Sequence, residues 1–345
     1  MSALFNKHDK KVLKERLHGH PQNRITLSFY KYHQIADPQA FRDTLYRQWS
    51  ELGVLGRTYV ASEGINAQIS VDNEKFDDFK KSLYAIDFLN GVRLNIAIED
   101  DGKSFFVLKI QLKKKIVADG LRDDDFDVTN SGKHLDAAGF NKITDQTETI
   151  VVDMRNHYES EVGHFKNAIC PDVDTFKDSL PLVEKLLEDK KDKPIVMYCT
   201  GGIRCEKASA WMKHRGFTNV FQLEGGIIEY TRQAKAQNLP NKFIGKNFVF
   251  DERLGERISQ EIISVCHQCG KPCDTHTNCR NEACHLLFIQ CDECKEKFNG
   301  SCSVECAEVI ALPADRQKEM RKGKAQGRMV YKKGRSANIK FRQKS

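Results

Sequence analysis

A cysteine at the junction of an apolar run and a glycine turn is the clearest candidate for chemistry in this chain. Residues 195–198 read Ile-Val-Met-Tyr, which predicts a buried strand, and Cys199 follows directly. Gly201 and Gly202 allow a tight turn before a helix expected over 207–215. Such a turn points backbone N–H groups at the sulfur from the positive end of the helix, which stabilises a thiolate. The pattern predicts a reactive Cys199; a structural cysteine at a strand end is the ordinary alternative.

The spacing between Cys199 and Arg204 separates two classes of enzyme. Cysteine phosphatases place an arginine six positions after the cysteine, whereas Arg204 lies five positions after Cys199. The shorter loop resembles that of rhodaneses, which carry a persulfide sulfur on the cysteine. We therefore take Cys199 as the catalytic residue, with Cys205 as a candidate resolving thiol. The predicted active-site loop also contains Thr200, Gly201, Gly202, Ile203, Arg204 and Cys205.

Two flanking stretches also resemble rhodanese sequences. Upstream, residues 153–155 read Asp-Met-Arg and residues 163–165 read Gly-His-Phe, in the order D-x-R, acidic residues, G-H-[IF]-x-x-A. Downstream, residues 223–226 read Leu-Glu-Gly-Gly, similar to the last strand and the turn into the closing helix. The resemblance implies a rhodanese-like α/β domain over 145–240.

The segment before this domain alternates strand-like and helical patterns. Expected strands are 25–32, 56–62, 66–71, 93–99 and 105–112, and expected helices are 38–52 and 75–84. This β-α-β-β-α-β order resembles an α+β ferredoxin-like or acylphosphatase-like domain, which we expect over 24–118. Such domains often bind RNA, but a fold alone does not decide a function.

Polar residues that follow two of these strands are candidate substrate contacts. Glu63 and Asn66 lie in the turn between the second and third strands, and Lys113, Lys114 and Lys115 follow the last strand. Glu63 and Asn66 could contact a base, and the three lysines could contact phosphate. A plain hairpin turn and a solvated charge run are the alternative interpretations.

Nine of the twelve cysteines lie between residues 266 and 306. Two C-x-x-C pairs separated by 21 residues closely match the spacing of a structural zinc ribbon. The other four candidate ligands could form a second, interleaved site. The eight candidates are Cys266, Cys269, Cys279, Cys284, Cys291, Cys294, Cys302 and Cys306.

Metal would supply much of the folding energy of this segment, because its apolar core is meagre. Cys273 and His285 are spare candidate ligands, and spacing does not decide which cysteines share a metal. Free thiols and an iron–sulfur cluster are the alternatives to zinc.

The last thirty residues are strongly basic. Residues 316–345 contain twelve Lys/Arg and one Glu, with Tyr331 and Phe341 among the charges. This composition predicts a flexible tail that contacts nucleic-acid phosphate and stacks bases. A tail that only improves solubility is the alternative.

Length and composition set the outer limits. With 345 residues and a net charge of +7, we expect two or three domains and allow for a polyanionic partner. No apolar run approaches the roughly 18 residues of a membrane span, and the N-terminus lacks a signal-peptide pattern, so we expect a cytoplasmic protein without membrane contact. In that compartment, cysteines favour metal binding or catalysis over disulfides. The expected divisions are an N-terminal arm (1–23), the acylphosphatase-like domain (24–118), a linker (119–144), the rhodanese-like domain (145–240), a Cys-rich zinc module (241–310) and a basic flexible tail (311–345).

Three motifs together resemble one bacterial family. The Ser-Glu-Gly-Ile-Asn turn at 62–66, the Cys199 loop and the Cys-His-Gln-Cys-Gly run at 266–270 are similar to those of tRNA uridine-34 hydroxylases, and the match covers about residues 10–310. The resemblance implies a cytoplasmic oxidoreductase that uses molecular oxygen to hydroxylate C5 of the wobble uridine in tRNA. It also implies that Cys199 is the family's key, persulfide-type cysteine.

Oxygen chemistry at C5 of uracil normally needs a redox centre. The chain has no G-x-G-x-x-G motif for flavin or NAD and no clear 2-His-1-carboxylate pattern, so the electron donor is unidentified. One hypothesis is that the Cys199 thiolate adds to C6 of uracil and makes C5 nucleophilic toward an oxygen donor.

Two functions of other classes fit parts of the pattern. A rhodanese-type sulfurtransferase would deliver persulfide sulfur to tRNA or to a small acceptor. A non-catalytic RNA-binding protein would use the rhodanese domain as a scaffold, although the intact Cys199, Gly202 and Arg204 weigh against it.

Overall fold

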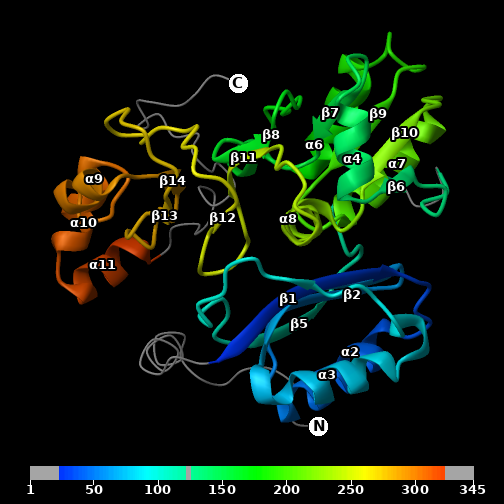
Figure 1. Cartoon of the computed structure of the whole chain (residues 1–345). Coiled ribbons are helices and arrows are strands. Elements are labelled where there is room, and N and C mark those ends of the chain that lie inside the picture. The colour runs from blue at the N-terminus through cyan, green and yellow to red at the C-terminus, as the bar shows by residue number, and fades with distance from the viewer. Residues whose placement is uncertain (1–22, 122–125, 323–345) are drawn as a thin grey trace.

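The computed structural model describes residues 23–121 and 126–322 (Figure 1). Figure 1 shows an N-terminal sheet domain, a domain built around a parallel sheet, and a small C-terminal Cys-rich module beside both. The predicted N-terminal arm up to residue 22 and the basic tail beyond residue 322 lie outside the described residues. No helix in the described ranges is both long enough and apolar enough to cross a bilayer.

The N-terminal domain is a five-stranded sheet in the order β4-β1-β3-β2-β5, with two helices on one face (Figure 1). Its elements are β1 (Arg24–Tyr32), α2 (Pro38–Glu51), β2 (Leu55–Ala61), β3 (Gly64–Asp72), α3 (Phe76–Tyr84), β4 (Asn95–Ile96) and β5 (Leu108–Leu112), with 3-10 turns η1 (Asn73–Lys75) and η2 (Asp87–Leu89). Along β1, Leu27 and Phe29 are buried in the core with Trp49 of α2. Because side chains alternate along a strand, Ser28 and Tyr30 lie on the opposite face, which is turned toward the parallel-sheet domain.

The fourth strand is much shorter than the predicted 93–99. It pairs with β1 only at Leu27 and Ser28, opposite Ile96 and Asn95. The remaining order of strands and helices agrees with the acylphosphatase-like prediction, and β5 adds a parallel strand beside β2.

The second domain is a three-layer α/β structure. Its four-stranded parallel sheet has the order β6-β10-β9-β7. Its elements are β6 (Lys133–Leu135), α4 (Ala137–Thr144), β7 (Ile150–Asp153), α5 (His157–Ser160), β8 (Gly163–Phe165), α6 (Phe176–Leu186), β9 (Ile195–Tyr198), α7 (Ile203–His214), β10 (Val220–Leu223) and α8 (Gly226–Ala236). One core packs α6 and α7 on the sheet, and a second packs α4 and α8 on its other face. A strand that is covered on both faces has apolar residues at every position rather than at alternate ones. This explains why the apolar run at 195–198 predicted a buried strand.

The expected linker over 119–144 contains ordered parts of this second domain. Residues 133–135 form the edge strand β6 beside β10, and Asp136 caps α4 by accepting a hydrogen bond from the N–H of Gly139. A three-residue edge strand with exposed polar side chains gives no hydrophobic pattern, so the sequence did not predict it.

The C-terminal module begins where β11 (Phe243–Asn247) pairs with β8 and with β12 (Glu256–Arg257). The rest of the module consists of β13 (His276–Asn278), β14 (Leu287–Ile289), α9 (Asp292–Lys297), α10 (Val304–Ala311) and α11 (Ala314–Arg321). Helix α11 lies inside the segment predicted as a flexible tail. Its last residue, Arg321, forms an ion pair with Glu282, so this first part of the tail is tied to the module.

Candidate active site

Cys199 lies at the carboxyl end of β9, and its side chain is almost fully buried. Gly202 caps α7 with a φ of 99°, a left-handed conformation that glycine adopts without steric cost. This turn directs the Gly202 N–H to the Sγ of Cys199 at 3.2 Å. The sulfur therefore faces the amino end of α7, as the sequence predicted.

A second helix fixes the same loop from the other side. The N–H groups of Ile227 and Ile228, in the first turn of α8, donate to the carbonyl oxygens of Cys199 and Thr200 at 3.0 and 3.2 Å. A side chain at Gly226 would place a Cβ 2.4 Å from the Cys199 carbonyl oxygen, so only glycine permits this approach. The loop is thus held between the amino ends of α7 and α8.

This environment favours the ionised form of Cys199. Burial alone would raise the pKa of the thiol, but a hydrogen bond from Cys205, the charge of Arg204 and backbone N–H groups outweigh it and lower the pKa to about 6. The pKa of Cys205 is raised well above its ordinary value by burial and by its hydrogen bond to Cys199. At neutral pH the pair is therefore a Cys199 thiolate that accepts a hydrogen bond from a protonated Cys205.

Arg204 acts on the sulfur from a fixed position. Its guanidinium group donates two hydrogen bonds of 2.8 Å to the buried carboxylate of Glu159, and a weaker one of 3.3 Å to the carbonyl of Met154. Glu159 also accepts from the backbone N–H of Asn156 at the start of α5. The sequence indicated Arg204 but not its partner; the run of acidic residues after the D-x-R motif was the available signal.

The D-x-R motif itself is structural. Asp153 and Arg155 form a fully buried ion pair at 2.6 Å, and Arg155 also donates to the carbonyl of Gly163. Tyr198 donates its hydroxyl to Asp153 at 2.8 Å. These bonds join the ends of β7 and β9 to β8 beneath the active-site loop.

Cys199 borders a small cavity of about 90 Å³ that lies between the N-terminal sheet, the Cys199 loop and the segment before β12. The N-terminal sheet contributes Ser28 and Tyr30, the loop contributes Cys199 and Thr200, and the segment before β12 contributes Phe250. The hydroxyl of Tyr30 also donates to Glu206 of α7 at 3.0 Å, which fixes the sheet against the loop. The N-terminal domain is therefore one wall of the candidate active site.

The predicted substrate contacts Glu63 and Asn66 lie in different surroundings in the structure. Glu63 accepts from the backbone N–H of Ile116 at 2.6 Å and binds the ammonium group of Lys207 of α7, also at 2.6 Å. Asn66 donates to the carbonyl of Ile116 at 3.1 Å but still lines the Cys199 cavity. Glu63 thus joins the two domains, and Asn66 remains beside the site.

The three predicted phosphate-binding lysines also differ in their surroundings. Lys115 is engaged with Asp119 at 2.9 Å and with the carbonyl of Leu121, whereas Lys113 and Lys114 are exposed. Lys113 lies over the ring of Tyr59, 5.3 Å from its centre. Only Lys113 and Lys114 are therefore available for a phosphate contact.

Lys207 is a buried residue that sequence reasoning missed. Its ammonium group pairs with Glu63, in the turn between β2 and β3, and with Asp119, in the segment after β5. Burial alone would raise the pKa of Asp119, but hydrogen bonds from Lys207 and Lys115 outweigh it and lower the pKa. A single lysine on a helix gives no local signal, because its partners are about 90 and 140 residues away in sequence.

Family models match three consecutive parts of the chain. Residues 24–116 match a UPF0176 acylphosphatase like domain, residues 136–233 a rhodanese-like domain, and residues 244–307 a rhodanase C-terminal region. A tRNA uridine(34) hydroxylase from Escherichia fergusonii is 55% identical over 97% of this chain and 96% of its own length. One from Salmonella arizonae is 56% identical over the same shares.

The chain belongs to the tRNA uridine(34) hydroxylase family. Both the prediction of this family and that of an acylphosphatase-like domain followed by a rhodanese-like domain are thereby confirmed. Among solved structures, a rhodanese-related protein from Thermoplasma volcanium is 22% identical and covers 32% of this chain and 97% of its own, with a TM-score of 0.26.

The Cys-rich module of this tRNA uridine(34) hydroxylase family member contains two groups of four cysteines. Within each group all four sulfur atoms lie within 4.8 Å of one another. The first group is Cys266, Cys269, Cys291 and Cys294, and the second is Cys279, Cys284, Cys302 and Cys306. Cys273 and His285 belong to neither group.

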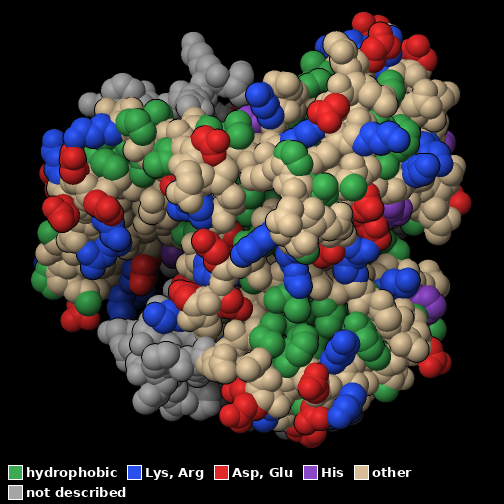
Figure 2. All heavy atoms as spheres, in the orientation of Figure 1, with side chains coloured by type: hydrophobic (Ala, Val, Ile, Leu, Met, Phe, Trp, Pro, Cys, Tyr) green, Lys and Arg blue, Asp and Glu red, His purple; other side chains and the backbone are tan. Residues whose placement is uncertain are grey.

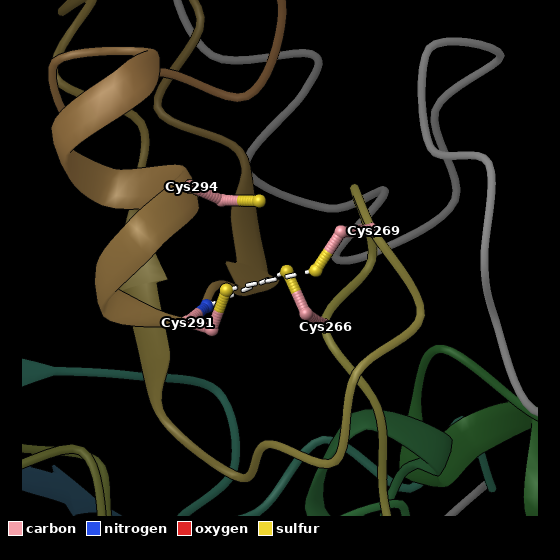
Figure 3. Close-up of side chains that lie close together, drawn as sticks. All are labelled: Cys266, Cys269, Cys291 and Cys294. Atoms are coloured by element: carbon pink, nitrogen blue, oxygen red, sulfur yellow. Dashed lines mark hydrogen bonds between the residues drawn. The ribbon is translucent and has the colours of Figure 1, made fainter.

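The sulfur geometry fits a tetrahedral metal ion. The sulfurs of Cys269 and Cys291 are 3.6 Å apart, and those of Cys302 and Cys306 are 3.8 Å apart. Zinc with Zn–S bonds of about 2.3 Å places sulfurs about 3.8 Å apart. Figure 3 shows the first group, with two cysteines from one loop facing the two near the start of α9. Each group could therefore hold a metal ion.

Proposed function

We propose that this protein hydroxylates the uridine at position 34 of tRNA. The observation that carries the proposal is that Cys199, whose sulfur accepts from the Gly202 N–H, borders a cavity formed jointly by the N-terminal sheet and the rhodanese-like loop. Relatives at 55% identity over nearly the whole chain are named for this reaction. An enzyme that acts on a base must take it into a pocket, and a wobble base in an anticodon loop is accessible for that.

The chemistry of this site fits covalent activation of the base. The Cys199 thiolate adds to C6 of uracil, and the electron pair of the C5–C6 double bond moves toward C5 and the C4 carbonyl. C5 then attacks an oxygen donor, the proton at C5 is lost, and the thiolate leaves from C6. With molecular oxygen as co-substrate, an external donor supplies two electrons, and the second oxygen atom leaves as water with two protons.

The residues around Cys199 have defined parts in this scheme. The N–H of Gly202, the Cys205 thiol and Arg204 keep the sulfur ionised before it attacks and stabilise it again when it leaves. Two hydrogen bonds to Glu159 fix the guanidinium group of Arg204, and its positive charge stabilises the Cys199 thiolate from this position.

The two cysteine groups are proposed as structural zinc sites. Four thiolates in each group satisfy the ligand set of closed zinc centres, and metal binding supports the folding of a module with little apolar core. Cluster residues Cys266 and Cys294 also pack with Tyr158 and Val162 of the rhodanese-like domain, so a folded module supports the α5 region.

tRNA contacts are proposed for the exposed lysines that follow β5 and for the basic tail. Lys and Arg side chains are intermixed with Asp and Glu over the face shown in Figure 2. The sequence beyond residue 322 has eight Lys/Arg and no acidic residue. Lys113, Lys114 and this tail are therefore the strongest candidates for phosphate contacts.

The deciding experiment is mass spectrometry of tRNA nucleosides from a deletion strain that carries either the wild-type gene or the Cys199→Ala variant. We expect 5-hydroxyuridine derivatives to be restored by the wild type and to be absent with Cys199→Ala. Loss of 2-thiouridine instead would assign a sulfurtransferase, and an unchanged nucleoside profile in the deletion strain would indicate a binding protein.

A further inference from the structure

Asn95 comes from the N-terminal domain and lies against the active-site loop. It occupies the edge strand β4, opposite Ser28 of β1, and only 3% of its surface is exposed. Its amide Nδ2 donates to the carbonyl of Gly201 at 3.3 Å. A Cβ at Gly201 would lie 3.4 Å from this nitrogen, an ordinary van der Waals distance, so the amide lies directly against the loop.

The other end of the Asn95 amide has no hydrogen-bond partner within the described residues. The carbonyl oxygen Oδ1 is buried, and so is the hydroxyl Oγ1 of Thr200, which also lacks a partner there. Leaving a buried polar group unsatisfied costs about 1–3 kcal/mol, so two such atoms in one place need an explanation.

Both residues line the cavity that Cys199 borders. The two residues that carry the orphan oxygens therefore come from the two sides of the site, Asn95 from the N-terminal sheet and Thr200 from the rhodanese-like loop. Phe105 and Phe250 also line this cavity and offer aromatic surface to a planar ligand. The site combines a nucleophile, a fixed acceptor, a hydroxyl and apolar walls, which are the groups that a flipped-out base requires.

We propose that Asn95 and Thr200 determine specificity for uracil in the Cys199 cavity, an inference that rests on the proposed function. Uracil presents an N3–H donor between two carbonyl acceptors. The Oδ1 of Asn95 accepts from N3–H, and the hydroxyl of Thr200 donates to an adjacent carbonyl oxygen. Cytosine has an unprotonated N3, so the same Asn95 oxygen would face another acceptor. The geometry thereby selects uridine over cytidine at position 34.

The orientation of the Asn95 amide supports this assignment. Because Nδ2 is committed to the carbonyl of Gly201, the side chain cannot rotate to present a donor to the cavity without losing that bond. Gln68, another amide that lines the cavity, has its Oε1 already engaged by Arg57 at 3.3 Å. Gln68 is therefore a matched control for Asn95, because it is an amide side chain in the same cavity whose oxygen already has a partner.

The test compares anticodon stem-loops that carry uridine or 3-methyluridine at position 34, because the methyl group removes the N3 donor and adds bulk there. For the wild type, kcat/KM for the 3-methyluridine substrate should be about 10- to 100-fold lower than kcat/KM for the uridine substrate. This is the range expected when a buried hydrogen-bonding group is left unpaired. In Asn95→Ala, kcat/KM for uridine should fall by a similar factor. In this variant the ratio of kcat/KM for uridine to kcat/KM for 3-methyluridine should approach one, because the Asn95 oxygen is absent and the methyl group has room.

Gln68→Ala should keep the wild-type ratio between the substrates. Thr200→Val, which replaces the hydroxyl by a methyl group of similar size, should lower kcat/KM for uridine without removing discrimination against 3-methyluridine. The pH profile of Cys199 alkylation should retain its midpoint in Asn95→Ala, which separates base recognition from support of the loop.

An unchanged substrate ratio in Asn95→Ala, or a loss of activity accompanied by a shifted alkylation profile, would overturn the inference. If Asn95→Ala does not fold, Asn95→Ser supplies the same comparison, because its shorter side chain also withdraws the acceptor. A wild-type protein that modifies neither substrate would overturn the proposed function itself.

Discussion

Arg204 and Glu159 face each other through two hydrogen bonds of 2.8 Å each, and both side chains are buried. The sequence placed Arg204 in the loop that follows Cys199, where a phosphatase would use its arginine to bind the substrate. In this protein the guanidinium is instead paired with a carboxylate 45 residues earlier. Arg204 therefore sets the electrostatic environment of Cys199 from a fixed position.

Replacing Glu159 with alanine should strongly destabilise the protein. The change leaves the charge of Arg204 buried and unpaired, which typically costs about 3–5 kcal/mol. Urea unfolding should show a lower midpoint than for the wild type. The exposed Glu188 is a matched control, because Glu188→Ala should change the free energy of unfolding by less than about 0.5 kcal/mol. Equal midpoints for the two variants would contradict a supporting role for the pair.

The reactivity of Cys199 should depend on pH with a midpoint near 6, the pKa given by its environment. Alkylation by iodoacetamide needs the thiolate, so the rate should be constant well above that pH and fall about tenfold per unit below it. Because this pKa is lower than the roughly 8.5 of an unfolded thiol, ionisation also favours folding. That stabilisation is complete above about pH 8.5 and is lost as the pH falls through 6. A midpoint near 8.5 would contradict the thiolate, and Cys199→Ser gives the background rate.

The hydrogen bond from Cys205 to Cys199 gives a matched pair of variants. Cys205→Ala removes the donor and should raise the pKa of Cys199, which moves the alkylation midpoint to higher pH. Cys205→Ser keeps a donor and should leave the midpoint closer to that of the wild type. If instead both variants abolish tRNA modification as completely as Cys199→Ala does, Cys205 acts as a resolving thiol.

Purified protein should contain two zinc ions per chain, one in each group of four cysteines. Cys291→Ser and Cys279→Ser should each lose one ion, and a strong chelator should unfold the module, as seen by faster proteolysis of residues 244–307. Cys170→Ser is the control, since Cys170 lies in the rhodanese-like domain outside both groups. Protein free of any metal after purification without chelator would contradict the zinc proposal, and bound iron with sulfide would identify a cluster instead.

Removal of the basic tail should weaken tRNA binding and should make the affinity for tRNA less dependent on salt concentration. Truncation after residue 322 preserves α11 with its Arg321–Glu282 ion pair and deletes eight Lys/Arg. Each phosphate that is no longer neutralised should reduce the slope of log affinity against log salt by about 0.7 to 0.9. The Cys199 alkylation rate is the internal control and should not change. An unchanged affinity and slope would assign the tail to solubility and leave Lys113 and Lys114 as the basic residues that bind phosphate.

Features that are encoded by neighbouring residues could be predicted from the amino-acid sequence. A buried strand, a cysteine, two glycines and a helix follow one another within about twenty residues, so the Cys199 loop and its orientation toward α7 could be predicted. The apolar run of β9 identified a strand that is buried in the sheet. The same locality let the C-x-x-C spacing indicate a metal module.

Contacts between residues that lie far apart in the sequence became evident only in the folded chain. Glu63 was a candidate base contact, but its carboxylate lies beside Lys207 and forms part of the junction between two domains. Asn95 gave no signal in the sequence, because it acquires its position only when the N-terminal sheet packs on the Gly201 carbonyl. A buried polar group must find a partner, and that partner can come from anywhere along the chain. Spacing in sequence therefore predicts the nucleophile and its loop, whereas the walls of the cavity and the ion pairs that align them follow from packing between domains.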